Sequence, residues 1–182
     1  DEKGTKTVYS TLTERWEEGS ICRGGVRVNY STKVQTSYAD NEVEHKAEKG
    51  TLWKIAYPTL DKIGESISAT ARPETLLGDT AIAVHPDDVR YKDLIGTRVL
   101  LPLLDREIPI IADEYVDPTY GTGAVKVTPA HDPNDFEIGQ RHNLPRIQVI
   151  DFDGTMIKLP LQYAGLTVEA ARKKVLVALE AA

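Results

Sequence analysis

Cysteine is almost absent from this sequence, since Cys22 is the only one among its 182 residues. A lone thiol cannot form an internal disulfide, and without a second thiol nearby it cannot build a cysteine-based zinc site. We therefore expect Cys22 to be a small buried or half-buried side chain. His131 and His142 stand in no metal-ligand pattern, so we also predict that the protein has no metal site.

Long apolar runs are missing as well. No stretch approaches the roughly 18 apolar residues that span a bilayer, and no basic segment followed by an apolar core marks a secretory signal. The hydrophobic fraction of 41% and the charged fraction of 27% are ordinary for a soluble domain. We therefore expect a soluble, cytoplasmic protein that does not enter a membrane.

The sequence has no excess of positive charge, because its formal net charge at pH 7 is −6. Proteins that wrap nucleic acid through a broad surface need clustered lysines and arginines for the phosphates. The charge excludes that mode of binding and leaves open a narrow contact with one strand end.

Three signatures of catalytic or nucleotide sites are also missing. The sequence contains no G-x-x-x-x-G-K phosphate loop, no G-x-S-x-G nucleophile elbow and no H-E-x-x-H zinc motif. Covalent catalysis by serine or cysteine is therefore disfavoured.

Short extended segments dominate the middle of the chain. They alternate apolar with polar residues or are continuously apolar, and glycine and proline turn signals separate them. These segments are residues 51–57, 63–70, 80–84, 99–101, 108–111, 124–128 and 147–150. Strands at this density predict a β-rich α/β fold, namely a closed or nearly closed β-barrel of short strands decorated by helices.

Three helices are predicted around these strands. Apolar residues at helical spacing over 8–18 predict a peripheral amphipathic helix. Asp132, as a cap before Pro133, predicts a second helix that runs to about residue 142. Thr167 caps a third helix through residue 181.

The first 46 residues contain little that could form an independent core. Residues 21–30 and 34–44 are extended runs around a turn, which predicts a β-ribbon. We therefore divide the chain into a helix and ribbon linker over residues 1–46 and a main domain over residues 47–182.

Polar side chains close two of the predicted strands. Arg72 and Thr75 follow one strand, and Lys126 and Thr128 share a face of another because side chains alternate along a strand. Taken singly, each has a structural explanation, such as a surface ion pair or a solvated strand face. A helix start follows Thr128 directly, which favours a shared pocket.

That helix start brings two carboxylates to the same place. Asp132 and Asp135 are three residues apart and so lie on one helical face. Alone, each could serve only as a cap or as a partner of the helix dipole. Tyr120 precedes a Gly-Thr-Gly turn and either faces the same pocket or packs on a neighbouring strand.

Two stretches carry a family resemblance that spans nearly the whole chain. Residues 70–79 (Thr-Ala-Arg-Pro-Glu-Thr-Leu-Leu-Gly-Asp) and 121–137, with Arg-His-Asn-Leu-Pro at 141–145, closely resemble the editing domain inserted in class I valyl-tRNA synthetases. The leucine and isoleucine relatives share the architecture, but Pro-Glu-Thr at 73–75 looks like the valine branch. The chain departs from the family pattern at Ala71. It also has Ser-Thr-Lys-Val at 31–34 where many relatives have a Cys-Pro-x-Cys knuckle, so no zinc is expected in the ribbon.

The resemblance implies hydrolysis of threonine wrongly esterified to the valine tRNA. A hydrophobic valine pocket cannot strongly reject near-isosteric threonine, for which valyl-tRNA synthetase is the established example. The implied partners are the 3′ acceptor end of that tRNA, carrying threonine, and the remainder of the synthetase chain, with the protein as a monomer. No cofactor is implied, since ATP and Mg²⁺ belong to the synthetic domain, whose His-Ile-Gly-His and Lys-Met-Ser-Lys-Ser type motifs are missing here.

The resemblance also implies a role for each pocket residue. Asp135 binds the substrate ammonium group, and together with Lys126 and Thr128 it offers partners for the threonine hydroxyl. Asp132 orients the attacking water, so Asp132, Lys126 and Thr128 form the catalytic set. The remaining residues bind substrate: Arg72 and Thr75 hold the terminal adenosine or the ester, and Tyr120 stacks on the terminal base.

Other functions remain open at this point. The same residues would suit the editing domain of a leucyl or isoleucyl relative, or a module that binds the tRNA acceptor end without catalysis. An aspartic-protease-like hydrolase has only Asp-Gly-Thr at 153–155 in its favour, and the paired Asp-Thr-Gly or Asp-Ser-Gly loops that it needs are missing.

Overall fold

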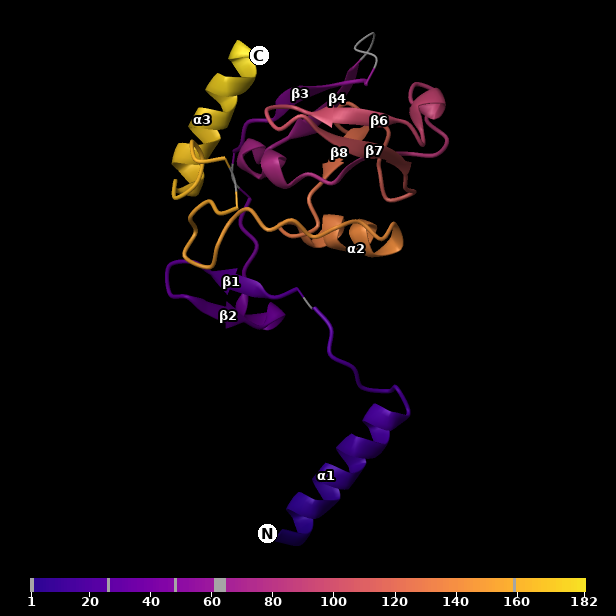
Figure 1. The fold of residues 1–182 in the computed structure, drawn as a ribbon, viewed down its shortest axis with the longest axis vertical. Helices are drawn as coiled ribbons and strands as arrows, with labels where there is room; N and C mark the ends of the chain where they lie inside the picture. The colour runs from indigo at the N-terminus through magenta and orange to yellow at the C-terminus, as the bar shows by residue number, and fades with distance from the viewer. Residues whose placement is uncertain (1, 26, 48, 61–64, 159) are drawn as a thin grey trace.

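The amino-terminal part of the chain extends away from the body in the computed structural model (Figure 1). Helix α1 (Glu2–Glu17) has no buried residue, and it is followed by a ribbon of β1 (Asn29–Ser31) and β2 (Thr36–Tyr38). A short 3-10 helix, η1 (Asp40–Glu42), follows the ribbon. The structure describes residues 2–25, 27–47, 49–60, 65–158 and 160–182.

The helix and ribbon differ from prediction in their lengths. Helix α1 begins at Glu2 rather than at residue 8, and the ribbon strands have three residues each. The prediction for Cys22 was wrong, because this residue is exposed. Cys22 belongs to the segment between α1 and β1, and this segment extends away from the body (Figure 1).

The body contains the remaining six strands, in two sheets. Strands β3 and β4 form an antiparallel hairpin, and the other four form a mixed sheet in the order β6-β7-β5-β8. In that sheet β5 runs parallel to β7 and antiparallel to β8. The strands are β3 (Trp53–Pro58), β4 (Glu65–Thr70), β5 (Ala81–Val84), β6 (Arg98–Leu101), β7 (Arg106–Ala112) and β8 (Ala124–Val127).

The predicted closed barrel is wrong, because among the described residues the strands form separate sheets. The hairpin meets the β6 side of the four-stranded sheet through one isolated bridge, Thr59 to Val99. At the β8 side, the amide of Lys126 donates to the side-chain hydroxyl of Ser68 at 2.9 Å. Strand patterns in the sequence locate these six strands, but they do not reveal that a side chain takes a hydrogen bond at this edge.

The strand predicted over residues 147–150 is also absent from the described part of the chain, where Ile150 makes a single bridge to Met156. The amide of Val149 instead donates to the ring of His131 at 2.9 Å. A side chain therefore occupies the position that a neighbouring strand would take. The predicted strand over 63–70 is confirmed from residue 65, and its first two residues lie outside the described part of the chain.

Helices α2 (Pro133–Arg141) and α3 (Val168–Ala181) confirm both predicted caps. The Asp132 carboxylate accepts from two amides of the first turn of α2, and the Thr167 hydroxyl accepts from Ala170. Two further 3-10 helices, η2 (Pro73–Gly78) and η3 (Lys92–Leu94), connect strands. Within the described ranges, no helix has both the length and the apolar character that a bilayer requires.

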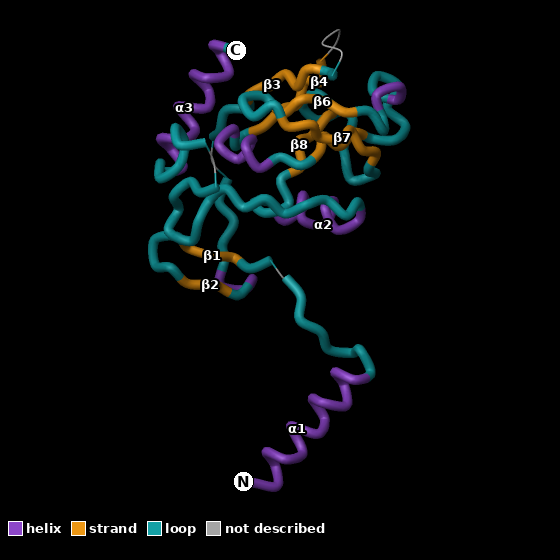
Figure 2. Tube along the Cα trace, viewed as in Figure 1, coloured by secondary structure: helices purple, strands orange, loops and turns teal. Residues whose placement is uncertain are grey.

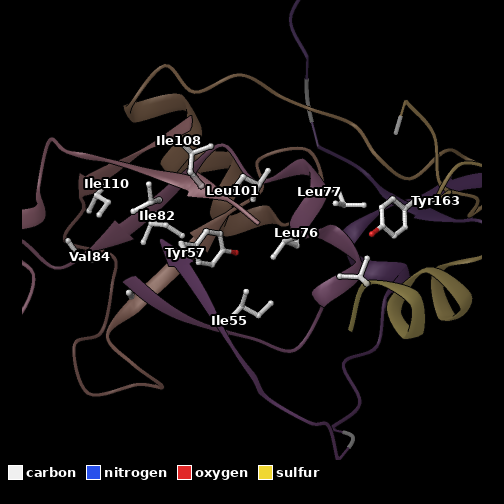
Figure 3. Close-up of a cluster of buried hydrophobic side chains, with 13 residues drawn as sticks. Ile55, Tyr57, Leu76, Leu77, Ile82, Val84, Leu101, Ile108, Ile110 and Tyr163 are labelled. Atoms are coloured by element: carbon white, nitrogen blue, oxygen red, sulfur yellow. The ribbon is translucent and has the colours of Figure 1, made fainter. Parts of the chain in front are cut away.

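The main core lies between the four-stranded sheet, the hairpin and helix α3 (Figure 3). All four residues of β5 are buried, as expected of a strand at the centre of a sheet. Leu76 and Leu77 of η2 are fully buried in this core, as is Tyr163, which lies near α3 (Figure 3). Because η2 is tied into the core by two leucines, the polar residues at its start are held in fixed positions.

The chain between α2 and α3 is almost entirely loop and runs past the β1–β2 ribbon (Figure 2). Phe152 in this loop makes an edge contact with Tyr30 of the ribbon, with ring centroids 5.0 Å apart. Arg27, just before β1, forms an ion pair with Glu137 of α2 at 3.3 Å. The ribbon therefore contacts the body at α2 and at the loop that follows it.

Candidate functional site

One cavity of about 200 Å³ opens between η2, β8 and the start of α2. The structure brings all seven of the predicted site residues to its wall, although they come from separate parts of the sequence. The cavity is lined by Leu52, Ala69, Thr70, Ala71, Arg72, Thr75, Tyr120, Val125, Lys126, Thr128, His131, Asp132 and Asp135.

The turn η2 carries the first pair of these residues. Pro73 occupies its first turn, where the missing amide costs nothing and the fixed φ suits the helix. Gly78 ends η2 where a β-carbon would lie 3.0 Å from the carbonyl oxygen of Ile147 and 3.2 Å from the methyl group of Thr128. A glycine is therefore needed for η2 to approach the end of β8 this closely.

Lys126 lies at the centre of the cavity wall, with its side chain only 8% exposed. Its ammonium nitrogen donates to the hydroxyls of Thr75 at 2.8 Å and Thr128 at 2.6 Å, and to the Asp79 carboxylate at 3.1 Å. An ammonium group has three protons, so this lysine has none left for a further acceptor. Its geometry suits holding the wall together.

Asp79 is the main residue that sequence reasoning missed. Its side chain is fully buried, and its carboxylate also accepts from Thr128 at 2.6 Å and from the phenol of Tyr57 at 2.7 Å. Burial raises the pKa of Asp79, although Lys126, Thr128 and Tyr57 all favour the charged form. One feature of the sequence could have identified Asp79. It stands just before a wholly apolar segment, and a carboxylate at the start of a buried strand needs a buried partner.

Both threonine hydroxyls have already donated their protons within the wall. Thr75 donates to the carbonyl of Arg72 at 3.0 Å, and Thr128 donates to Asp79. Each hydroxyl oxygen has two lone pairs and accepts once from Lys126, so each keeps one lone pair. The wall is therefore suited to accept a hydrogen bond from a ligand hydroxyl.

The start of α2 supplies the two carboxylates. One oxygen of Asp132 accepts from the amides of Asn134 and Asp135, and the other accepts no hydrogen bond from a described residue. Asp135 is buried and accepts from the amide of Thr128 at 2.8 Å. Burial raises the pKa of Asp135 to about 6, against the lowering effects of that hydrogen bond and of Lys126. Near pH 7 its carboxylate is charged.

Arg72 and Tyr120 lie at the more exposed part of the wall. The Arg72 guanidinium donates to the carbonyl of His131 at 2.8 Å, and its side chain is 46% exposed. Tyr120 is 65% exposed, and it precedes Gly121, whose φ of +61° is a conformation that favours glycine. The Tyr120 ring therefore presents an uncovered aromatic surface beside the cavity.

His131 lines the cavity as a neutral ring. Its Nε2 accepts from the amide of Val149, so that nitrogen carries no proton. Burial, helped by the nearby charges of Arg72 and Lys126, lowers the pKa of His131 to about 4. The histidine is thus held as a hydrogen-bond acceptor and connects β8 with the loop after α2.

The low pKa of His131 predicts a loss of stability in mild acid. Between pH 7 and pH 5 the unfolded histidine takes up a proton and the folded one does not, so its contribution to stability falls as the pH falls. We expect a loss of about 1–2 kcal/mol, after allowance for partial exposure. Urea unfolding of the 182-residue chain at the two pH values measures it.

The matched control is His131→Gln, which removes this titration. Asp135 acts in the opposite direction over part of the range, because its raised pKa makes the folded protein take up a proton near pH 6. That contribution is common to both proteins and cancels in the comparison. An equal change with pH in wild type and His131→Gln would contradict the assignment of His131 as the acid-sensitive group.

Metal ligation is not supported by any cluster in the part of the chain that the structure describes. There, no group of three or more histidine, cysteine, aspartate or glutamate side chains is arranged to hold an ion. The buried carboxylates of Asp79 and Asp135 bond to Lys126 and to a backbone amide respectively.

Comparison with known proteins identifies the architecture. A family model described as the editing domain of leucyl-tRNA synthetase matches residues 90–174. The leucyl-tRNA synthetase of Agrobacterium radiobacter K84, solved as a ternary complex described as agnB2 LeuRS-tRNA-LeuAMS, has a TM-score of 0.57 at 24% identity over 70% of this chain and 18% of that one. The CP1 domain GlLeuRS-CP1 has a TM-score of 0.53 at 16% identity, over 64% of this chain and 80% of that one. These two structures share the fold.

Valine–tRNA ligases are much closer in sequence. The ligase of Geobacillus stearothermophilus is 54% identical over 175 residues, which are 96% of this chain and 20% of that protein. The ligase of Thermotoga maritima is 48% identical over 180 residues, 99% of this chain and 21% of that protein. The chain spans about a fifth of the length of these curated relatives.

The fold, the polar cavity and these matches define the class: the chain belongs to the editing domains of the class I aminoacyl-tRNA synthetases. Within that class it belongs to the valine branch, since valine–tRNA ligases match it over almost its whole length.

Proposed function

We propose that this domain hydrolyses the ester between threonine and the valine tRNA, and so removes an amino acid that was attached in error. The observation that carries the proposal is the cavity whose wall combines the Asp135 carboxylate with the fixed hydroxyls of Thr75 and Thr128. Pockets that enclose drug-sized ligands measure roughly 300–1,000 Å³. A cavity of about 200 Å³ suits a group of amino-acid size.

The wall favours threonine over valine through unpaired lone pairs. Thr75 and Thr128 have no hydroxyl proton left to give, so each offers one acceptor site to the threonine hydroxyl. The threonine hydroxyl has one proton and pairs with one of these acceptors, whereas valine has the same shape and no donor and leaves that acceptor without a partner. An unsatisfied buried acceptor costs about 1–3 kcal/mol, which corresponds to a discrimination of roughly 5- to 150-fold.

The ammonium group of the substrate is the natural partner of Asp135. One carboxylate oxygen of Asp135 accepts from the amide of Thr128, and the other is left for the ligand. Charge-assisted hydrogen bonds are about twice as strong as neutral ones. Asp135 therefore fixes the α-carbon of the substrate relative to the hydroxyl-reading wall.

Hydrolysis needs a positioned water and a stabilised carbonyl oxygen. Asp132 has one oxygen fixed as the cap of α2 and one that orients the water. The water oxygen attacks the ester carbonyl carbon, the bond to the ribose oxygen breaks, and the water's proton ends on that ribose oxygen. Arg72 provides positive charge for the carbonyl oxygen or the adenosine, and Lys126 keeps the wall in place for this step.

The proposed partner is the 3′ end of the valine tRNA, with Tyr120 stacking on its terminal base. An aminoacyl ester is already activated, so the proposal needs no cofactor in this domain. The leucyl-tRNA synthetase of similar fold was solved with tRNA, which supports this class of partner. Residues 1–46 would tether residues 47–182 to the rest of a synthetase chain that acts as a monomer.

The test compares the threonyl and valyl esters of the valine tRNA as substrates of the full-length ligase that carries this segment. We expect the threonyl ester to be hydrolysed roughly 5- to 150-fold faster. Equal rates would contradict the discrimination by hydroxyl acceptors. Binding of both esters without hydrolysis would instead indicate a module that recognises the acceptor end.

A further inference from the structure

Helix α3 is joined to the turn η2 by a buried ion pair. The Glu74 carboxylate has no exposed surface, and Arg172 of α3 donates to both of its oxygens at 2.8 and 2.9 Å. This is a bidentate pair, the geometry in which arginine binds a carboxylate most strongly. Arg172 is not among the residues that line the cavity.

A second arginine faces the same carboxylate from the cavity side. The Nε of Arg72 lies 3.6 Å from one Glu74 oxygen, while another nitrogen of Arg72 donates to the carbonyl of His131. The Glu74 carboxylate therefore lies between two guanidinium groups, that of Arg172 on α3 and that of Arg72 on the cavity wall. Of these two arginines, Arg72 is the one that can contact a ligand in the cavity.

The charge balance of Glu74 depends on both arginines. A carboxylate without exposed surface needs compensation, and among the described residues Arg172 and Arg72 are its ion-pair partners. If Arg172 is removed, Arg72 is the remaining cation. The carboxylate would then draw the Arg72 guanidinium from 3.6 Å into direct contact, away from the carbonyl of His131 and from the cavity.

We propose that Arg172 is a positioning residue: it neutralises the Glu74 carboxylate and so leaves Arg72 extended into the cavity. The proposal rests on the proposed function insofar as Arg72 binds the substrate. Arg172 itself is 37% exposed and is not needed to fill the core, because α3 docks through the fully buried Ala171 and Val175. The loss of Arg172 should therefore affect ligand binding more than folding.

The test is a double-mutant cycle in the full-length ligase with Arg172→Ala, Arg72→Ala and the double variant. Two assays are used. A binding assay gives the Kd for a non-hydrolysable amide analogue of threonyl-adenosine, and steady-state hydrolysis gives the kcat and KM for the threonyl ester. We expect Arg172→Ala to raise Kd and KM about tenfold with kcat changed less than about twofold, as the loss of one charge-assisted hydrogen bond implies. Lys173→Ala, an exposed neighbour on the same helix, is the matched control and should leave both unchanged.

The cycle separates positioning from general stability. If Arg172 acts through Arg72, adding Arg172→Ala to Arg72→Ala raises Kd no further. Additive effects, or an Arg172→Ala Kd equal to wild type, would overturn the proposal. If Arg172→Ala does not fold, Arg172→Lys replaces it in the cycle, since lysine keeps the charge without the two-pronged contact. A wild-type ligase that binds the analogue without hydrolysing the ester would contradict the proposed function, and the Kd cycle would still test Arg172.

Discussion

Replacing Asp79 by alanine is expected to lower the free energy of unfolding by about 3–5 kcal/mol, because it leaves the Lys126 ammonium buried without a counter-charge. The side chain of Lys126 is 8% exposed and that of Asp79 is fully buried, so water cannot replace the lost partner. Thr128 and Tyr57 would also lose the acceptor for their hydroxyl protons. Urea unfolding of wild type and variant measures the difference.

Two controls make this prediction specific. Asp93→Ala removes an exposed carboxylate and should change stability by less than about 0.5 kcal/mol. The double variant Asp79→Leu/Lys126→Met replaces both charges with apolar groups and should recover part of the loss, because a buried ion pair adds little net stability over hydrophobic residues, while Thr128 and Tyr57 still lack an acceptor. If stability recovers and ester hydrolysis does not, the charged pair is needed for the site and is dispensable for folding. A stable Asp79→Ala would show that Lys126 is not held in the way described.

The second large effect is expected from Asp135→Asn, which should reduce hydrolysis of the threonyl ester about 100-fold or more. Asparagine can still accept from the amide of Thr128 through its carbonyl oxygen. Its NH₂ group then faces the cavity, where it opposes the substrate ammonium instead of binding it. The fold is retained and the binding of the α-amino group is lost. Steady-state hydrolysis by the full-length ligase measures the effect, and Glu137→Gln on the exposed side of α2 is the control.

The same carboxylate predicts a pH profile. Because burial raises the pKa of Asp135 to about 6, the carboxylate becomes protonated in mild acid and can no longer pair with an ammonium. Hydrolysis should rise with pH up to about 6 and level off above it, with roughly a tenfold loss for each pH unit below. In Asp135→Asn this step should vanish. If the pH profile of the variant kept this step, the titration would have to be assigned to another group.

The parts of this protein that the sequence predicts well are local. The cap at Asp132 and the proline after it determine the start of α2 without help from distant residues, and the structure confirms that start. The alternation of Lys126 with Thr128 likewise follows from strand geometry, and their 2.6 Å contact agrees with a shared face. The meeting of all seven site residues at one cavity was anticipated from the family resemblance more than from spacing.

The parts that could not be predicted depend on pairs far apart in the chain. Nothing near Asp79 in the sequence indicates that its partners are Tyr57 and Lys126, and nothing near Glu74 points to Arg172, 98 residues away. The closed barrel failed for the same reason, because a sequence pattern identifies strands and leaves open which edges pair. Here a serine hydroxyl at position 68 takes a hydrogen bond at the edge of β8.

The three bonds of Lys126 have a consequence for how the site meets its ligand. Thr75, Asp79 and Thr128 come from a turn, the approach to one strand and the end of another, and a single ammonium group links them. The empty and occupied cavity should therefore have the same wall, with no rearrangement before recognition. The domain would then select its substrate with a preformed site, without induced fit. The rate at which successive esters are tested would be set by how quickly the end of the tRNA enters and leaves the cavity.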